Sequence, residues 1–181
     1  MAESLETTYR RLLEAAAFAA RAHRGQVRKD KETPYVSHVF RVCLVARDIF
    51  GFSDQRILIT ALLHDTVEDT TTDFDDLEEK FGKEIAEWVA FLSKDKRLQE
   101  EEREQAYIAN LATAPWQVKA CKLADIFDNL MDLSQLPLEK QPHTLNRLEG
   151  YVNALRGNAA EEIRRPLALV SQLLQEIKMK V

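Results

Sequence analysis

The spacing of apolar residues is the feature of this sequence that most restricts its fold. In the first segment Leu12, Leu13, Ala16, Ala19 and Ala20 fall on one side of a helix, and most later segments repeat this spacing. No alternation of Val, Ile or Thr with polar residues is long enough for a sheet. Only five Gly and five Pro interrupt a chain dominated by Ala, Leu and Glu, which favours helix. The sequence therefore predicts an all-α fold.

Glycine, proline and capping residues divide the chain into about eight helices of unequal length, which does not fit a simple four-helix bundle. We expect one domain over residues 1–181, because this length suits a single sizeable core. Ser53 or Asp54 is expected to cap a helix that continues through His64, and a charged segment from Ser93 is expected to be a mobile loop that enters a helix. The last two helices are predicted at 142–156 and 158–179, with Pro166 as a break or restart.

Composition limits the possible partners and the location. The net charge of −5 argues against a nucleic-acid-binding protein, which is normally basic. No apolar run is long enough for a membrane span or a signal core, so a cytoplasmic protein without membrane partners is expected. Cys43 and Cys121 lie singly in apolar runs and are predicted to be buried hydrophobic residues. No feature of the sequence indicates an oligomeric state.

The stretch "ALLHDTVEDT" joins an apolar helix to a cluster of ionisable groups. His64, Asp65, Glu68 and Asp69 lie within six positions, with no Lys or Arg among them, so burying them together is costly. In a continuous helix His64 aligns with Glu68, and Asp65 with Asp69. A bound divalent cation would turn the clustered carboxylates into ligands. The ordinary alternative is a helix end with solvated acids.

Two further residues in apolar helices could complete a metal site. His38 lies in "TPYVSHVFRV", where a satisfied core histidine is the ordinary interpretation. Asp125 lies in an apolar stripe of "KACKLADIFDNL" and needs a partner, which could be Lys122 or a helix N-terminus. Together with His64 and Asp65 they form a mixed nitrogen and oxygen set without thiolate, which suits Mn²⁺, Fe²⁺, Zn²⁺ or Mg²⁺.

A basic segment precedes His38 in this net-acidic chain. "HRGQVRKDK" carries five basic residues in nine positions, namely His23, Arg24, Arg28, Lys29 and Lys31. A solvated loop is the usual interpretation of such a run. A basic loop beside a metal would instead hold a polyanionic substrate.

Three stretches together resemble the hydrolase domain of the Rel/SpoT family of HD-domain phosphohydrolases. They are "AHRGQVRKDKETPYVSHVFRV", "ALLHDTVEDT" and "KLADIFDNLMDL", which run from residue 22 to 133 in the family's order and spacing. "SKDKRLQEEER" resembles the linking segment of the stand-alone small alarmone hydrolases of the metazoan type. The resemblance implies an HD-domain helical fold and a nucleotide substrate. It gives no reason to expect alarmone synthesis.

The implied reaction removes the 3′-pyrophosphate of guanosine tetra- or pentaphosphate by attack of a metal-bound water, and the metal is usually Mn²⁺. The resemblance assigns residues by position: metal ligands His38, His64, Asp65 and Asp125; Glu68 and Asp69 as the acids that orient or activate the water; Arg28, Lys29 and Asn129 as nucleotide contacts.

The chain departs from this family at Ile126-Phe127-Asp128, where many members carry a basic residue after the aspartate. The loss of a positive charge and the gain of Asp128 are expected to affect substrate placement, but not metal binding. Two other functions fit the same motifs. One is an HD phosphohydrolase of another nucleotide, such as NADPH or a deoxynucleotide, and the other is a non-catalytic nucleotide sensor.

Overall fold

The computed structural model describes residues 5–157 and 159–180, and its regular elements are all helical. The elements are α1 (Leu5–Ala22), α2 (Val36–Leu44), the π-helical η1 (Val45–Ile49), α3 (Gln55–Leu63), α4 (Thr66–Asp69), α5 (Phe74–Phe81), α6 (Lys83–Leu92), α7 (Glu100–Thr113), α8 (Trp116–Met131), the 3₁₀ turns η2 (Leu133–Gln135) and η3 (Leu138–Lys140), α9 (Gln141–Arg156) and α10 (Glu161–Lys178). The predicted all-α class is confirmed.

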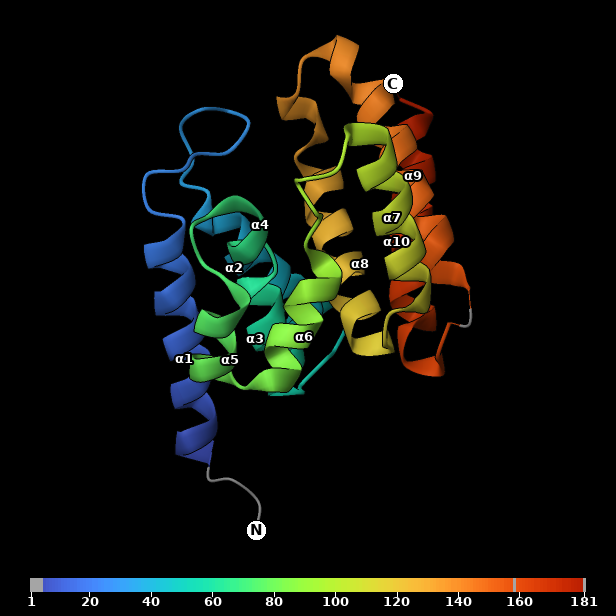
Figure 1. The fold of residues 1–181 in the computed structure, drawn as a ribbon. Helices are drawn as coiled ribbons and strands as arrows, with labels where there is room; N and C mark the ends of the chain where they lie inside the picture. Colours follow the sequence, from blue (N-terminus) through green and yellow to red (C-terminus); the bar gives the residue numbers. More distant parts are fainter. Residues whose placement is uncertain (1–4, 158, 181) are drawn as a thin grey trace.

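Helix α8 lies at the centre of the fold. Helices α1 to α6 gather on one side of it and α7, α9 and α10 on the other, which we call the first and second lobes (Figure 1). It packs against α2, α3 and α6 of the first lobe and against α9 and α10 of the second. An unbroken buried run, from Val118 to Ile126, reflects this position, because a helix that is buried on all sides needs no polar stripe.

Several local signals in the sequence fix where helices begin and end. Asp54 caps α3 by accepting a hydrogen bond from the Arg56 backbone, as expected. Asp73 and Asp76 form a capping box at α5, and Gly82, with φ of 88°, separates α5 from α6. Both cysteines are buried, as predicted. Within the described chain, no helix combines the length and the apolarity needed to cross a membrane.

Two helix boundaries differ from the prediction. Helix α3 ends at Leu63 and does not continue through "HDTVED", because Asp65 leaves helical geometry, with φ of −101° and ψ of −2°. Helix α10 runs without interruption through Pro166, which is buried. Proline cannot donate to the carbonyl of Glu162, four positions earlier, and burial of Ile163, Pro166 and Leu167 against the core holds the helix together despite this loss. The predicted start of this helix, residue 158, lies outside the described residues.

Candidate active site

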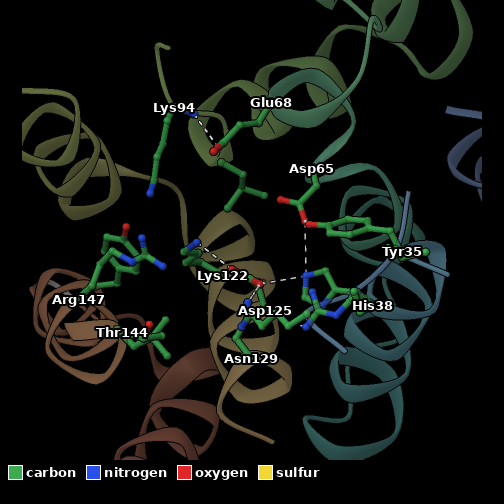
Figure 2. A pocket seen from close by; sticks show the side chains of 16 residues that line it. Tyr35, His38, Asp65, Glu68, Lys94, Lys122, Asp125, Asn129, Thr144 and Arg147 are labelled. Carbon is green, nitrogen blue, oxygen red and sulfur yellow. Dashed lines mark hydrogen bonds and ion pairs between the residues drawn. The ribbon is translucent and has the colours of Figure 1, made fainter. Parts of the chain in front are cut away.

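The four predicted metal ligands come together from three parts of the fold. His38 lies on α2, His64 and Asp65 lie in the turn between α3 and α4, and Asp125 lies on α8. Nε2 of His38 lies 3.4 Å from Asp65 Oδ2 and 3.2 Å from Asp125 Oδ1 (Figure 2). Nε2 of His64 lies 3.0 Å and 3.7 Å from the same two oxygens. Two imidazole nitrogens and two carboxylate oxygens therefore face one small volume.

The hydrogen bonds of the two histidines leave their Nε2 atoms available as ligands. Nδ1 of His64 lies 2.8 Å from the carbonyl of Ala61, which can only accept, so this nitrogen carries the hydrogen. Nε2 of His64 is buried and has no hydrogen-bond partner, because the nearby Asp65 oxygen lacks hydrogen-bond geometry. The ligand atoms of His38, His64 and Asp65 lie within 4.8 Å of one another. These residues fit a divalent cation bound by nitrogen and oxygen.

Charges in the cluster compensate one another strongly. Burial by itself lowers the pKa of His38, but hydrogen bonds to Asp125, Asp128 and Asp65 outweigh it and raise the pKa to about 9. The pKa of His64 is likewise raised, mainly by Asp65, against the effect of burial. Burial alone would raise the pKa of Asp65, yet the neighbouring histidines hold it well below its usual range. The histidines and aspartates of this buried cluster thus stabilise one another's charged forms.

Asp125 pairs with Lys122, the ordinary partner that the sequence suggests, and it also faces the two histidines. Its Oδ2 accepts a hydrogen bond from Lys122 Nζ at 2.8 Å, and its Oδ1 accepts one from Asn129 Nδ2 at 2.5 Å while pointing toward both histidines. Lys122, followed by His38, holds the pKa of Asp125 well below its usual range despite burial. The sequence leaves pairing with Lys122 and a place beside the histidines as alternatives, but the Asp125 carboxylate does both, with one oxygen each.

Glu68 and Asp69, which follow His64 and Asp65 in the sequence, lie in different surroundings. Glu68 lines the cavity beside the ligands, and its Oε2 accepts a hydrogen bond from the backbone N–H of Lys94 at 3.0 Å (Figure 2). Burial raises the pKa of the Glu68 carboxyl. Asp69 is exposed outside the cavity lining and pairs with Lys96 at 2.9 Å. Because the helix is interrupted between α3 and α4, His64 and Glu68 do not lie on one continuous helix. Asp65 and Asp69 remain one turn apart, and the Tyr35 hydroxyl donates to both, to Asp65 Oδ2 at 2.6 Å and to Asp69 Oδ2 at 3.4 Å.

A cavity of about 380 Å³ lies over the cluster. Asp65, Glu68 and Asp125 are acidic residues in its lining, and the basic lining residues come from four parts of the chain (Figure 2). The basic residues are Arg28, Lys29, Lys94, Lys122 and Arg147. Acidic groups suited to a cation and basic groups suited to phosphates therefore share one cavity.

Sequence reasoning missed part of this basic lining. Lys94 lies in the loop before α7 and Arg147 lies on α9, next to Thr144 of the same cavity. Both belong to charged surroundings in the sequence, where a solvated side chain is the usual interpretation. Lys122 lies in an apolar stripe, where a charged residue is unusual, but the sequence suggests it only as a partner of Asp125 and not as part of the cavity lining.

The predicted nucleotide contacts Arg28, Lys29 and Asn129 lie at the cavity, and all three have hydrogen-bond partners within the protein. Arg28 is 7% exposed, and its Nη2 donates to Asp132 Oδ2 at 3.0 Å and to Asn129 Oδ1 at 3.4 Å. Nζ of Lys29 lies 3.3 Å from the same Asn129 oxygen, and burial, followed by the charge of Arg28, lowers the pKa of Lys29. The basic segment is therefore partly built into the site, whereas Arg24 and Lys31 are exposed.

Ile126 and Asp128, where the chain departs from the family pattern, both lie outside the cavity lining. Ile126 is fully buried in the core, and Asp128 is 3% exposed and absent from the cavity lining. Asp128 instead lies behind His38, with its Oδ2 2.6 Å from His38 Nδ1. The Asp128 charge therefore faces His38 and Arg41, and it also lies 3.8 Å from Nη2 of Arg28, which lines the cavity. An effect of Asp128 on substrate placement stays a prediction.

Comparisons with known proteins identify the family of this chain. Residues 15–154 match a family model described as HD domain. The guanosine-3′,5′-bis(diphosphate) 3′-pyrophosphohydrolase MESH1 of Drosophila melanogaster is 42% identical over 124 residues, which cover 68% of this chain and 69% of the fly protein. MESH1 of Danio rerio is 39% identical over 160 residues, which cover 83% of this chain and 88% of the fish protein. The solved structure of a metazoan orthologue of SpoT that hydrolyses ppGpp has a TM-score of 0.81 at 33% identity, covering 99% of this chain and 97% of that one.

Proposed function

Because the chain belongs to the HD-domain family, we propose that it is a metal-dependent hydrolase of guanosine 3′,5′-bis(diphosphate) that releases GDP and pyrophosphate. The cavity is the observation that carries this proposal, because it joins a cation-binding cluster to a basic lining. The relatives named as 3′-pyrophosphohydrolases support the choice of substrate. Guanosine pentaphosphate would give GTP in the same way.

We propose Mn²⁺ as the cation, held by His38, His64, Asp65 and Asp125. When bound, such a cation supplies Lewis acidity, which lowers the pKa of water and stabilises charge on phosphoryl oxygens. His64 donates its Nδ1–H to Ala61, which keeps its Nε2 directed at the site. Lys122 holds one oxygen of Asp125 and leaves the other toward the histidines.

In the proposed reaction the oxygen of water bonds to the phosphorus next to the ribose, and the bond from that phosphorus to the 3′ oxygen breaks. Glu68 is the proposed proton acceptor for this water, because it lines the cavity beside the ligands and burial raises its pKa. The backbone N–H of Lys94 holds Glu68 Oε2 and so orients the carboxylate. Asp69 supports this arrangement from outside the cavity, through its pairing with Lys96.

The basic lining is proposed to bind the two diphosphates. Lys29 donates to Asn129 Oδ1 at 3.3 Å, next to Asp125 on α8. Lys94 comes to the cavity from the loop before α7, and Arg147 from α9 (Figure 2). Arg147 is exposed, and its guanidinium can bind two phosphoryl oxygens at once. Arg28 holds Asn129 in place, and so acts on the substrate mainly through its neighbour.

The test is a nucleotide panel with the Mn²⁺-loaded protein. We expect release of pyrophosphate from guanosine tetraphosphate, with much slower release of phosphate from NADPH or of phosphates from deoxynucleotides. Cleavage of NADPH or a deoxynucleotide, with the alarmone left intact, would keep the hydrolase chemistry and overturn the substrate. Tight binding of the alarmone without turnover would indicate the non-catalytic sensor.

A further inference from the structure

Asp128 lies in a buried charged network behind His38. Its Oδ2 is 2.6 Å from His38 Nδ1, and Arg41 donates from Nε to Asp128 Oδ1 at 2.7 Å and from Nη2 to Oδ2 at 2.9 Å. The carboxylate therefore has a donor on each oxygen. Asp132, one turn further along the chain, pairs with Arg41 and Arg28 but makes no hydrogen bond to either ligand histidine.

The two ligand histidines differ in the group that holds Nδ1. Nδ1 of His64 donates to a neutral backbone carbonyl, whereas Nδ1 of His38 faces the carboxylate of Asp128, a residue that is only 3% exposed. Burial of a carboxylate is costly unless it is paired and hydrogen-bonded. A carboxylate on the far nitrogen of a metal-bound imidazole fixes its tautomer and orientation and makes the ligand more basic.

We propose that Asp128, held by Arg41, is a positioning residue that keeps the hydrogen of His38 on Nδ1 and directs its Nε2 toward the cation. The inference rests on the metal centre of the proposed function and extends it to residues outside the cavity. It also gives a role to the part of "KLADIFDNL" that departs from the family pattern. Arg41 keeps the carboxylate oriented, because it donates to both of its oxygens.

The first experiment measures Mn²⁺ affinity by calorimetry for Asp128→Asn, with Asp132→Asn as the matched control. Loss of a group that orients a ligand typically weakens metal affinity about 10–100-fold, and we expect a loss of this size for Asp128→Asn. Asp132→Asn removes the same charge from the same arginines but leaves His38 untouched, so its affinity should stay close to that of the unaltered protein. Equal losses in the two variants would overturn the proposal.

A second experiment separates positioning from a structural role. Asp128→Asn leaves Arg41 paired with Asp132 alone, so it is combined with Arg41→Gln, which neutralises the pair of residues 128 and 41 while Asp132 keeps Arg28 as its partner. We expect the double variant to regain thermal stability but to keep the weak Mn²⁺ affinity. Nitrogen-15 NMR of the imidazoles with Zn²⁺ should show a changed Nδ1 signal for His38 and an unchanged one for His64.

The outcomes distinguish this inference from the function on which it rests. If the unaltered protein bound no Mn²⁺, or bound it equally well after His64→Ala, the metal centre itself would be wrong. If the unaltered protein bound Mn²⁺ through His64 and the double variant recovered full affinity, only the role of Asp128 would be wrong.

Discussion

Replacing Glu68 by glutamine tests the proposed proton acceptor. Glutamine keeps the size of the side chain, and its Oε1 can still accept the hydrogen bond from the Lys94 backbone, which spans 3.0 Å in the structure. Metal and substrate binding should therefore persist, and only the capacity to take a proton is lost. General acid–base catalysis contributes about 10²–10⁴-fold, so we expect kcat to fall by that factor, a rise of about 3–5 kcal/mol in the barrier.

Asp69→Asn is the matched control, because it is the same kind of change one residue along the chain. The Asp69 side chain is 35% exposed and its pairing with Lys96 lies outside the cavity lining. An exposed ion pair is worth at most about 1 kcal/mol, so kcat should change by less than about tenfold. This contrast separates the two acids that the family resemblance assigns together.

The assay is pyrophosphate release at saturating substrate and Mn²⁺, with metal content measured on the same samples. Burial raises the pKa of Glu68, and a protonated carboxyl cannot accept a proton, so the unaltered enzyme should lose activity as pH falls through that raised pKa. Glu68→Gln should lack this acidic limb. Near-normal kcat in Glu68→Gln, a larger loss in Asp69→Asn, or loss of metal with Glu68→Gln would refute the reasoning.

Three substitutions probe the basic groups, and removal of the metal probes the cation. Lys29→Ala should lower kcat/KM by about ten- to a hundredfold, because a charge-assisted hydrogen bond is worth roughly 1.5–3 kcal/mol, and steady-state kinetics at low and high salt should show a smaller loss at high salt. Arg28→Ala should destabilise the fold by about 1.5–3 kcal/mol in urea unfolding, because it removes a charge-assisted hydrogen bond to Asp132, which keeps Arg41 as its partner; unchanged stability would contradict this. Arg147→Ala should raise KM for the alarmone without changing Mn²⁺ content. Chelation of the metal should lower Tm in calorimetry, and Mn²⁺ at a hundred times its Kd should restore about 2.7 kcal/mol, or roughly 5–10 °C; an unaltered Tm would argue against the centre.

The sequence predicts the class of the fold and the residues proposed as metal ligands, for physical reasons. Helical spacing and scarce glycine and proline are local properties, so the all-α fold could be read from them. His38 and Asp125 stood out because each lies in an apolar helix, where an ionisable group needs a partner. The structure brings both to His64 and Asp65 at distances of 3.0–3.7 Å.

Other features depend on tertiary packing and carry weaker signals. The helix break at Asp65 follows a run that is compatible with continued helix, so nothing local marks it. Lys94 and Arg147 lie in charged segments and become part of the site only because the second lobe packs on α8. Asp128 looked like an unfavourable charge near a substrate, because its side of α8 could not be known before α2 was placed.

Helix α8 carries both a proposed metal ligand and a basic residue of the cavity lining. Asp125 and Lys122 lie three residues apart on α8, so they share one face of the helix, and their side chains meet at 2.8 Å. Lys122 also lies over the rings of Tyr107 and Tyr151, at 5.1 and 4.9 Å from their centroids, where cation–π attraction holds it. A phosphate bound by Lys122 would therefore keep a fixed position relative to the ligand carboxylate, because one rigid helix carries both. The position of a phosphate bound by Arg147 depends instead on how α9 packs against α8. Changes in that packing should therefore alter substrate affinity before they alter metal binding.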